Sequence, residues 1–549
     1  MRSPRDILKA LRPRDFLVLA MGACLVGLFA WETVVTPEFV PDDSYITFVF
    51  SRNLARGLGP TYGLGMHIEG YSNFLWMALV AIPLAIRRNM DPVLAARVAS
   101  LPFVLMLFAG TFALARRRAG AVPSLAAVGL LAVNVNLVLA YDSGLETLPY
   151  AALLSAGFAA QAWSDESSRA RRLVIPLFVA AALTRIDGFL PLGFVIAVEA
   201  ARAFVARRSL VALVRWALPG VLVWCAWFAW RYWYYGLPLP STYYAKQLIP
   251  ELLPRRGPEY VFDELAGSGL WIALGAFGFL LYRRQREAVP VGLYAIGQLA
   301  YAAKVGGDWM PSARFVLPAT PLLVVLLAWA VDDLIRLAAE RGRALHALVS
   351  TASVGLLVWI GARSEPHGTD PYVDGKKGFA LSQQAHVAGL LEAASYLAVA
   401  VPKGGRLVTD YGGVIAYYTA SNPIEMWGLC NATIATRGDS RGVQPIYGKT
   451  CPSCYPELRP EYFHVYQPIV RRVDSFARHA DVVRSVWQTD TIGRYMDIMG
   501  GFVSGRVRNE RNGRAVWFLE KKGDGWKPHP RRAGGRFVVE YPFVPGGLI

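Results

Sequence analysis

The stretch FVPDDSYITFVFSRNLARGLGPTYG, residues 39–63, follows the first apolar segment of the chain and places two adjacent carboxylates, Asp42 and Asp43, directly after a proline. Side chains of neighbouring residues diverge in most backbone conformations, so the two acids can take different tasks. The continuation SYITFVFSRNLARGLG has an amphipathic pattern that predicts an interfacial helix. Such a helix would hold the acidic pair at a fixed depth beside a membrane.

The composition indicates a protein with many membrane-spanning helices. Of the 549 residues, 54% are hydrophobic and 18% are charged, and the mean hydropathy is +0.33. Twelve apolar segments approach the length of about 20 residues that a helix needs to cross a bilayer. They lie at 15–35, 71–87, 93–115, 122–140, 145–163, 171–184, 186–204, 211–231, 266–283, 287–304, 314–336 and 344–362.

The positions of the basic residues predict the orientation. Despite the net charge of +17, nucleic acid is not an expected partner, because Lys and Arg gather in short runs between apolar segments. The basic start and the long first segment predict a retained helix with a cytoplasmic amino end rather than a cleaved signal peptide. The later basic runs all lie on the cytoplasmic side if eleven segments cross the membrane and the 71–87 segment is a juxtamembrane or re-entrant helix. The expected location is therefore the cytoplasmic (inner) membrane, with multiple passes.

This topology predicts two domains. A transmembrane domain covers residues 1–362, and residues 363–549, where Gly, Pro and charged residues rise, form an extracytoplasmic domain. In the second domain GRLVTDYGGVIAYYT predicts a strand followed by a helix, and RAVWFLEKK and GRFVVEYPF predict strands. The expected fold is a mostly α polytopic membrane protein with a C-terminal mixed α/β domain.

Acidic residues gather at the outer ends of the predicted helices. A single carboxylate at such a place is more often a structural group, but several on one face favour an aqueous site. The seven are Asp42, Asp43, Glu69, Asp142, Glu146, Asp187 and Asp308.

Basic residues on the same face depart from the positive-inside bias. Lys246 and Arg314 lie in turn-rich segments whose backbone N–H groups, together with the cation, suit a phosphate, and Arg185 lies at the same side. For Arg231 and Lys304, snorkelling towards lipid headgroups is an equal alternative. The combination suits a lipid-phosphate donor held by cations while a carboxylate takes the proton of an incoming hydroxyl.

Five ordered motifs resemble the GT-C superfamily of polyprenyl-phosphate-dependent glycosyltransferases across residues 38–320. They are PDDSYITFVFSRNLARGLGPTYGLGMHIEGYSNFLW, YDSGLET, LTRIDGF, YYGLPLPSTYYAK and GGDWMPSARFVLP. Within the superfamily they are most similar to the terminal β-(1→2)-arabinofuranosyltransferases of actinobacterial cell-wall arabinan. The resemblance implies a multi-helix membrane domain with its catalytic carboxylate in the first outer loop, followed by an extracytoplasmic domain.

The resemblance also implies roles for individual residues. Asp42 and Asp43 match the family's acidic pair, with Asp42 the favoured base. Seven further positions are implied to bind the donor: Lys246, Arg314, Arg185, Glu69, Glu146, Asp308 and His67. The sequence departs from the family pattern at MHIEG, residues 66–70, where His67 replaces a basic residue, and its tail is shorter, so the donor is better defined than the acceptor.

The expected function is transfer of a sugar, arabinofuranose by the resemblance, from a polyprenyl-phosphate donor to an extracytoplasmic glycan, glycolipid or protein. One alternative is a transporter or flippase of lipid-linked sugars, although the sequence shows neither repeated halves nor mid-membrane charges. Another is a GT-C enzyme that uses a different polyprenyl-phosphate sugar, such as mannose. The residues predict no metal ligand set and no particular cofactor, while the need for a divalent cation stays open.

Three of the five cysteines lie in the predicted outer tail. An oxidising compartment permits a disulfide between Cys430 and either Cys451 or Cys454, or one within the CPSC sequence. One thiol remains unpaired in each arrangement. Zinc bound with the help of His464 is the less favoured alternative.

Overall fold

The computed structural model describes residues 13–246, 253–308, 310, 312–363, 375–439, 448–449 and 451–464, and the backbone of strand residues 502–509, 515–521, 532–533 and 537–540. The basic start of the chain, up to residue 12, lies outside these ranges. The chain folds into two compact units that interleave along the sequence. The helical unit comprises Met1–Phe39, Ala96–Ala226 and Pro250–Ser382, and the mixed unit comprises Val40–Ala95, Trp227–Ile249 and Gln383–Ile549.

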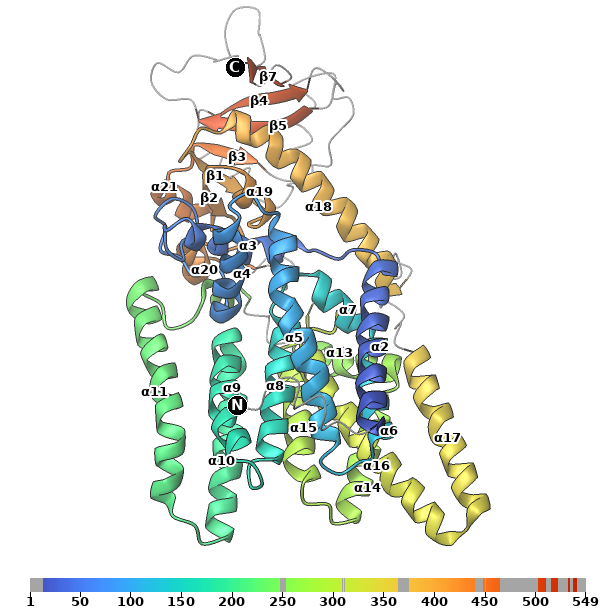
Figure 1. Cartoon of the computed structure of the whole chain (residues 1–549). Coiled ribbons are helices and arrows are strands. Elements are labelled where there is room, and N and C mark those ends of the chain that lie inside the picture. Colours follow the sequence, from blue (N-terminus) through green and yellow to red (C-terminus); the bar gives the residue numbers. More distant parts are fainter. Residues whose placement is uncertain are drawn as a thin grey trace, which may run out of the picture. The chain divides into compact units, whose positions relative to one another are not determined.

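The expected mostly helical architecture is confirmed, and every one of the twelve apolar segments coincides with a helix (Figure 1). Three of the five boundaries between the two units fall inside helices, namely α5, α11 and α18. The helices that belong wholly or partly to the helical unit are α2 (Pro13–Val35), α5 (Pro92–Ala115), α6 (Ala121–Ala132), α7 (Val135–Asp142), α8 (Thr147–Ala162), α9 (Ser168–Thr184), α10 (Phe189–Val205), α11 (Leu210–Tyr235), α13 (Leu253–Ser268), α14 (Ile272–Tyr282), α15 (Ala288–Lys304), α16 (Thr320–Arg341), α17 (Arg343–Ala362) and α18 (Gly375–Ala400).

Length and composition identify the helices that can cross a bilayer. Within the described ranges, five segments qualify singly: in α2, α5, α10, α11 and α17. Two bent pairs, α6 with α7 and α13 with α14, raise the number to seven if each pair is one span. The eleven crossings expected from the sequence therefore stay a prediction. Helix α4 (Phe74–Ile86), in the segment expected not to cross, has 13 residues and is short for a span.

The segment before α14 differs from expectation. The apolar segments predicted at 211–231 and 266–283 leave residues 232–265 between them, but part of this interval is helical: α13 occupies Leu253–Ser268 and meets α14 at an angle of 87°. The bend falls at Gly269, whose φ of +72° belongs to the left-handed region that glycine adopts without strain. A Cβ there would also lie 2.7 Å from the Trp359 ring, so the turn is packed closely as well as sharply bent.

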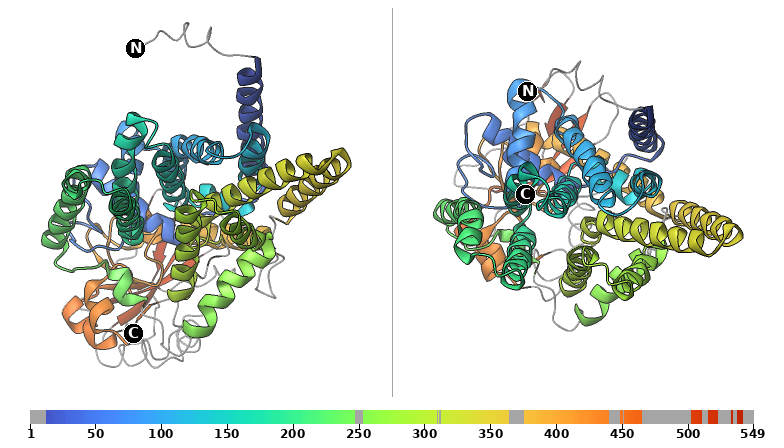
Figure 2. Two further views of the ribbon diagram at one scale, coloured as in Figure 1. Left: turned by 90° about the horizontal axis from the view of Figure 1, so that it is seen from below. Right: turned by 60° about the horizontal axis from the view of Figure 1, so that its bottom comes forward.

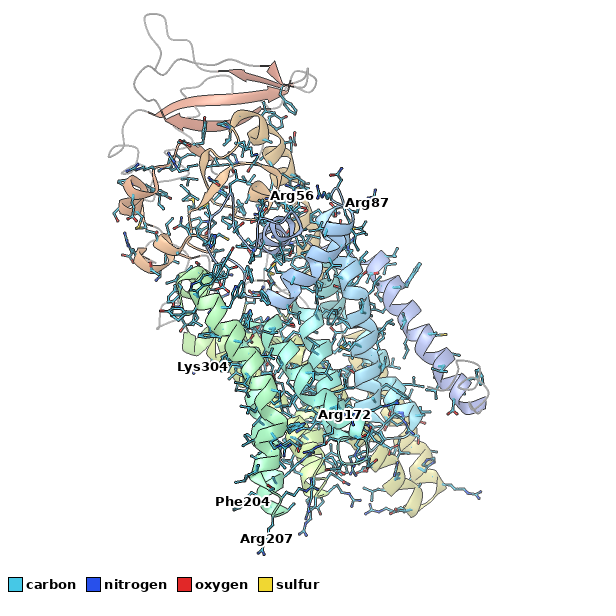
Figure 3. All side chains as sticks on the ribbon, turned by 60° about the vertical axis from the view of Figure 1, so that its left-hand side comes forward. Arg56, Arg87, Arg172, Phe204, Arg207 and Lys304 are labelled. Atoms are coloured by element: carbon cyan, nitrogen blue, oxygen red, sulfur yellow. A yellow bond between two sulfur atoms is a disulfide. The ribbon has the colours of Figure 1, made fainter. Side chains whose placement is uncertain are left out.

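The core of the helical unit lies around α8 and α16. Almost all of α8 is buried, as is most of α16, which is the pattern of a helix that is apolar on every side. Helices α8, α9 and α10 lie side by side (Figure 1), while α17 lies at the edge of the unit beside α16 (Figure 2). Beyond the end of α10, Arg207 extends away from the ribbon (Figure 3).

The mixed unit contains a seven-stranded sheet among its described residues, in the order β2-β1-β3-β5-β4-β7-β6. Strands β2, β1 and β3 are parallel to one another, and the remaining pairings are antiparallel. The predicted strand and helix in GRLVTDYGGVIAYYT, and the two later predicted strands, are present as β1, α19, β5 and β7. The strands are β1 (Arg406–Thr409), β2 (Asn422–Glu425), β3 (Tyr462–His464), β4 (Phe502–Asn509), β5 (Ala515–Lys521), β6 (Arg532–Ala533) and β7 (Phe537–Glu540), and the short helices are α12 (Ser241–Ala245), α19 (Val414–Tyr418), α20 (Ala432–Arg437) and α21 (Tyr455–Leu458).

The interleaving of the two units concerns two predictions: the domain boundary at residue 362 and the interfacial position of the helix that begins at Asp42. The first outer loop, with α3 (Asp42–Ala55) and α4, belongs to the same compact unit as the C-terminal sheet. The division at residue 362 into a membrane domain and an extracytoplasmic domain stays a prediction. Helix α3 was expected at an interface, but most of its residues are buried, and Ile46, Val49 and Phe50 pack with Tyr62 of the mixed unit.

The cysteine alternatives are resolved. A disulfide joins Cys451 to Cys454, within the CPSC sequence, and Cys430 is a buried free thiol. With both CPSC thiols in a disulfide, the zinc alternative loses two of its ligands.

Close helix packing in the helical unit leads to a first prediction. Gly110 of α5 lies against α8, where a Cβ would be 2.8 Å from the Ala156 backbone nitrogen, and the neighbouring hydroxyls of Thr111 and Ser155 are 2.9 Å apart. Because backbone atoms leave no room, Gly110→Ala should destabilise the protein by about 1–3 kcal/mol. The melting temperature in detergent measures the effect.

The matched control is Gly193→Ala in α10, where a Cβ meets nothing within 4 Å. Alanine is the better helix former, so this variant should melt at or above the temperature of the parent. Equal melting temperatures for the two variants would contradict the close approach of α5 and α8.

Candidate active site

The acidic pair opens α3. Pro41 precedes the helix in an extended conformation, with φ −74° and ψ 158°, and Asp42 and Asp43 are its first two residues. Negative side chains at this end of a helix are stabilised by the unpaired N–H groups and by the helix dipole. The carboxylate of Asp42 then reaches the tail of the chain: its oxygens accept hydrogen bonds from the backbone N–H groups of Gly413 at 3.0 Å and Val414 at 2.7 Å.

The turn that binds Asp42 is held from several sides. The Tyr62 hydroxyl donates a hydrogen bond to the Gly412 carbonyl at 2.7 Å. The Arg52 guanidinium donates a hydrogen bond to the Tyr417 carbonyl and lies over the aromatic ring of Tyr417. A Cβ on Gly413 would overlap the Asp42 backbone, and one on Gly412 would lie 2.7 Å from the Glu425 side chain. The two consecutive glycines are thus what allows the tail to approach the first loop.

Two carboxyl groups lie close to this turn. The pKa of Asp42 is raised to about 7: burial is the largest cause, the neighbouring charge of Asp43 adds to the rise, and the two backbone N–H groups oppose it. Burial also raises the pKa of Glu425, at the end of β2, to about 8, although backbone N–H groups of Trp427 and Cys430 bind its two oxygens. Both groups therefore hold protons at a higher pH than exposed acids do.

Asp43 has different surroundings. Its Oδ2 lies 3.8 Å from the Nζ atom of Lys246, and the side chains of Asp43 and Lys246 are 22% and 32% exposed. Both oxygens of Asp42 already bind the tail, whereas Asp43 faces a half-exposed cation. The sequence favoured Asp42 as the base, but the geometry favours Asp43 as the carboxylate that can reach a substrate. The catalytic role of either residue stays a prediction.

Glu69 and His67, predicted to bind the donor, lie in the same unit. Glu69 forms a buried ion pair with Arg231, in which Nε lies 2.9 Å from Oε1 and Nη2 binds Oε2. Arg231 is 1% exposed, so the snorkelling alternative for this residue is wrong. His67 stacks on Tyr234, with 4.2 Å between the ring centres.

The other predicted donor-binding residues belong to the helical unit. Arg185 lies between two acids, with Nη1 3.1 Å from Glu146 Oε1 and Nε 2.9 Å from Asp187 Oδ1. Arg314 pairs with Asp308 at 2.8 Å. Each of these predicted cations is therefore already balanced by a carboxylate. The seven predicted donor-binding residues divide between the two units, and their contact with a donor stays a prediction.

Sequence reasoning missed several residues at this site. Gly412, Gly413, Tyr62 and Glu425 hold the turn against Asp42, and none of them was predicted. The glycine pair after a predicted strand is a signal for a tight turn, which makes it the one element that was open to prediction. The described part of the chain contains no group of three or more His, Cys, Asp or Glu residues that could hold a metal ion.

The fold is similar to that of two solved structures. ArnT from Cupriavidus metallidurans, solved bound to undecaprenyl phosphate, matches with a TM-score of 0.55 and 14% identity over 92% of this chain and 98% of ArnT. The oligosaccharyltransferase of Archaeoglobus fulgidus, solved with a tethered acceptor peptide, matches with a TM-score of 0.51 and 11% identity over 92% of this chain and 74% of that chain. Fold and composition together define a multi-pass, mostly helical membrane protein.

The matches show a fold that this chain shares with known enzymes. ArnT and the oligosaccharyltransferase are GT-C glycosyltransferases, and the fold of this chain is similar to theirs. In sequence it is similar to the terminal β-(1→2)-arabinofuranosyltransferase of Corynebacterium glutamicum, with 24% identity over 343 residues. The match covers 55% of this chain and half the length of that relative. No protein-family profile matches the sequence.

The buried Glu425 carboxyl predicts a pH dependence of stability. Its pKa is about 8 in the fold and about 4.5 in an exposed glutamate. A group that binds its proton more tightly in the folded chain stabilises the fold fully below the lower pKa and loses that contribution as the pH rises through the higher one. The melting temperature in detergent should therefore fall as the pH rises from about 5 to about 8, and it should fall less in Glu425→Gln.

The control is Glu457→Gln, since Glu457 is an exposed acid of the same unit, paired with Arg437. This variant should keep the full pH dependence of the parent. A Glu425→Gln variant that loses as much stability as the parent over the same pH range would show that this carboxyl is not the titrating group.

Proposed function

We propose that the protein is a membrane glycosyltransferase that transfers a sugar from a polyprenyl-phosphate donor to an extracytoplasmic glycan, glycolipid or protein. The observation that carries the proposal is the pairing of Asp43 with Lys246 at the start of α3 in a chain of GT-C fold. The fold shared with two glycosyltransferases favours an enzyme over the transporter alternative. Arabinofuranose as the sugar is supported by the Corynebacterium relative.

The geometry suits a division of work between the two acids. Asp43 accepts the proton of the acceptor hydroxyl, whose oxygen forms a bond to the anomeric carbon while the bond from that carbon to the phosphate oxygen breaks. The polyprenyl phosphate leaves with the bonding electron pair, and the ammonium group of Lys246 stabilises its charge. Asp42 keeps the first loop bound to the tail turn, so it acts as a positioning residue.

The location and the remaining residues complete the proposal. The site lies on the extracytoplasmic side of a cytoplasmic (inner) membrane, consistent with the positive-inside pattern of the basic runs. Arg314, Arg185 and the acids that balance them serve the donor, a role that the resemblance of their motifs supports. A divalent cation remains compatible with the proposal, because carboxylates and phosphate oxygens are the ligands that Mg²⁺ prefers.

The two aspartates should respond differently to the same substitution. Asp43→Asn should abolish sugar transfer from polyprenyl-phosphoryl arabinofuranose and change the melting temperature little, because the side chain is 22% exposed and its ion pair with Lys246 is long, at 3.8 Å. Asp42→Asn should lower both the rate of sugar transfer and the melting temperature, because an amide nitrogen would face the N–H group of Gly413 or Val414. Transfer is measured as labelled sugar that reaches an arabinan acceptor.

The control for this pair is Asp165→Asn, an exposed acid that pairs with Arg208 in the helical unit. It should keep full activity and full stability. Full activity in Asp43→Asn would refute the proposed base, and transfer of mannose in place of arabinofuranose by the unmodified protein would replace the proposed donor sugar.

Donor binding should depend on the predicted cations. Lys246→Ala and Arg314→Ala should each weaken the binding of undecaprenyl phosphate by about 1.5–3 kcal/mol, which is the contribution of a hydrogen bond to a charged group. Titration of the purified protein with this lipid measures the change. The exposed Lys403 of the mixed unit gives the control Lys403→Ala, which should bind as the parent does. Unchanged affinity in both test variants would remove these cations from the donor site.

A further inference from the structure

The ion pair between Glu69 and Arg231 lies within the mixed unit and is almost fully buried. The side chains are 4% and 1% exposed, and the planar guanidinium binds both oxygens of the carboxylate. Arg231 also lies over the rings of Phe228 and Trp227. A buried pair of this kind is often replaceable by apolar residues without loss of stability, so stability alone does not explain its presence.

The pair is bonded to the outer loop that follows α11. The third guanidinium nitrogen, Nη1, donates to the Pro238 carbonyl at 2.5 Å. On the other side, the backbone carbonyl of Glu69 accepts a hydrogen bond from the Ser241 N–H at 2.9 Å. Gly236, with φ +75°, provides the turn between these contacts and α11. Both partners of the ion pair thus hold the segment from residue 238 to residue 241.

A second contact holds the same two segments in register. The hydroxyl of Tyr235, the last residue of α11, donates to the Pro60 carbonyl at 2.7 Å and lies 2.9 Å from the Tyr71 hydroxyl. The first loop is therefore bonded to the end of α11 on both sides of Glu69. The ion pair supplies the charged part of this contact and the tyrosines supply the neutral part.

The loop held in this way leads directly to Lys246. Helix α12 begins at Ser241 and ends after one turn, where the Lys246 N–H donates to the Thr242 carbonyl at 3.0 Å. A helix of five residues has little freedom once its first residue is fixed. The position of Ser241 consequently decides where Lys246 lies, and its Nζ atom is 3.8 Å from Asp43.

We propose that Glu69 and Arg231 are positioning residues that hold Lys246 opposite Asp43 and thereby set the affinity of the site for a lipid phosphate. The inference rests on the function proposed above and changes the role of Glu69, which the sequence assigned to the donor itself. Arg231 does not bind the phosphate, because its nitrogens are used by Glu69 and Pro238. Lysine cannot replace it, because a single ammonium group does not reproduce the planar fork of the guanidinium group.

The first test measures the position of Lys246 without a substrate. A carbodiimide should cross-link Lys246 to Asp43 in the purified full-length protein, and mass spectrometry of the joined peptides gives the yield. Arg231→Lys and Glu69→Gln should lower this yield several-fold. The control Glu461→Gln, which removes an ion pair with Arg406 elsewhere in the unit, should leave the yield unchanged. An unchanged yield in both test variants would overturn the proposal.

The second test asks whether the ion pair acts through Lys246. Arg231→Lys should weaken the binding of undecaprenyl phosphate about tenfold or more, as expected for loss of a charge-assisted hydrogen bond. Added to Lys246→Ala, the same substitution should have no further effect, because the cation that it positions is already absent. If the two substitutions instead weaken the binding of undecaprenyl phosphate additively, the ion pair has a general structural role and the proposal is overturned.

The two tests separate this inference from the proposed function. If Lys246→Ala binds undecaprenyl phosphate as the parent does, the proposed donor role of Lys246 and the part of the inference that concerns affinity are both refuted. The cross-linking yield then decides alone whether the pair positions Lys246. If Glu69→Gln fails to fold, Arg231→Lys gives the answer, because it retains the positive charge opposite Glu69. Melting temperatures of all variants show whether a change in yield merely follows unfolding.

Discussion

The hydrogen bonds from Gly413 and Val414 to the Asp42 carboxylate are the contact on which the mixed unit depends. They join the first loop of the chain to a turn more than three hundred residues later, and they do so at the position that carries the candidate chemistry. A carboxylate that accepts two backbone N–H bonds is strongly oriented. Asp43 is the next residue of the same helix, so these bonds also fix the start of the helix on which Asp43 lies. The Asp43 carboxylate itself does not take part in them. In the proposed mechanism, the support of the site and its reactive group are thus adjacent residues with separate tasks.

The same contact explains why so many polar groups are buried nearby. The tail can approach α3 only because Gly412 and Gly413 have no side chains, and the backbone groups that this approach buries must all find partners. Tyr62 and Asp42 satisfy the turn itself, while Glu425 satisfies the N–H groups that follow β2. Burial of these carboxyls raises their pKa values, so the site is built from groups whose charge depends on pH.

Local patterns predicted the apolar helices and three strands of the tail, β1, β5 and β7, because hydropathy and periodicity are properties of neighbouring residues. The pattern could not show that the first loop folds with the tail, since Asp42 and Gly413 are 371 residues apart in sequence. It also left two alternatives open for Arg231. A cation at the end of an apolar helix has the same local sequence whether it reaches lipid headgroups or a buried glutamate from another loop. The close packing at the Gly269 bend likewise involves Trp359, a residue 90 positions further along the chain, so it is not a property of the local sequence either.

The way in which the cations are paired separates structural from ligand-binding roles. Arg231 binds Glu69 in buried, closely spaced geometry, and a phosphate could replace that partner only by leaving a buried acid without a counter-charge. The pair of Lys246 and Asp43 is different, because it is longer, half-exposed and made by a flexible ammonium group. An exposed pair of this kind contributes little stability, so its partners can exchange for substrate groups at small cost. The proposed function makes use of this contrast: a donor phosphate can take Lys246 as its partner without leaving a buried charge behind, while Asp43 faces the incoming hydroxyl.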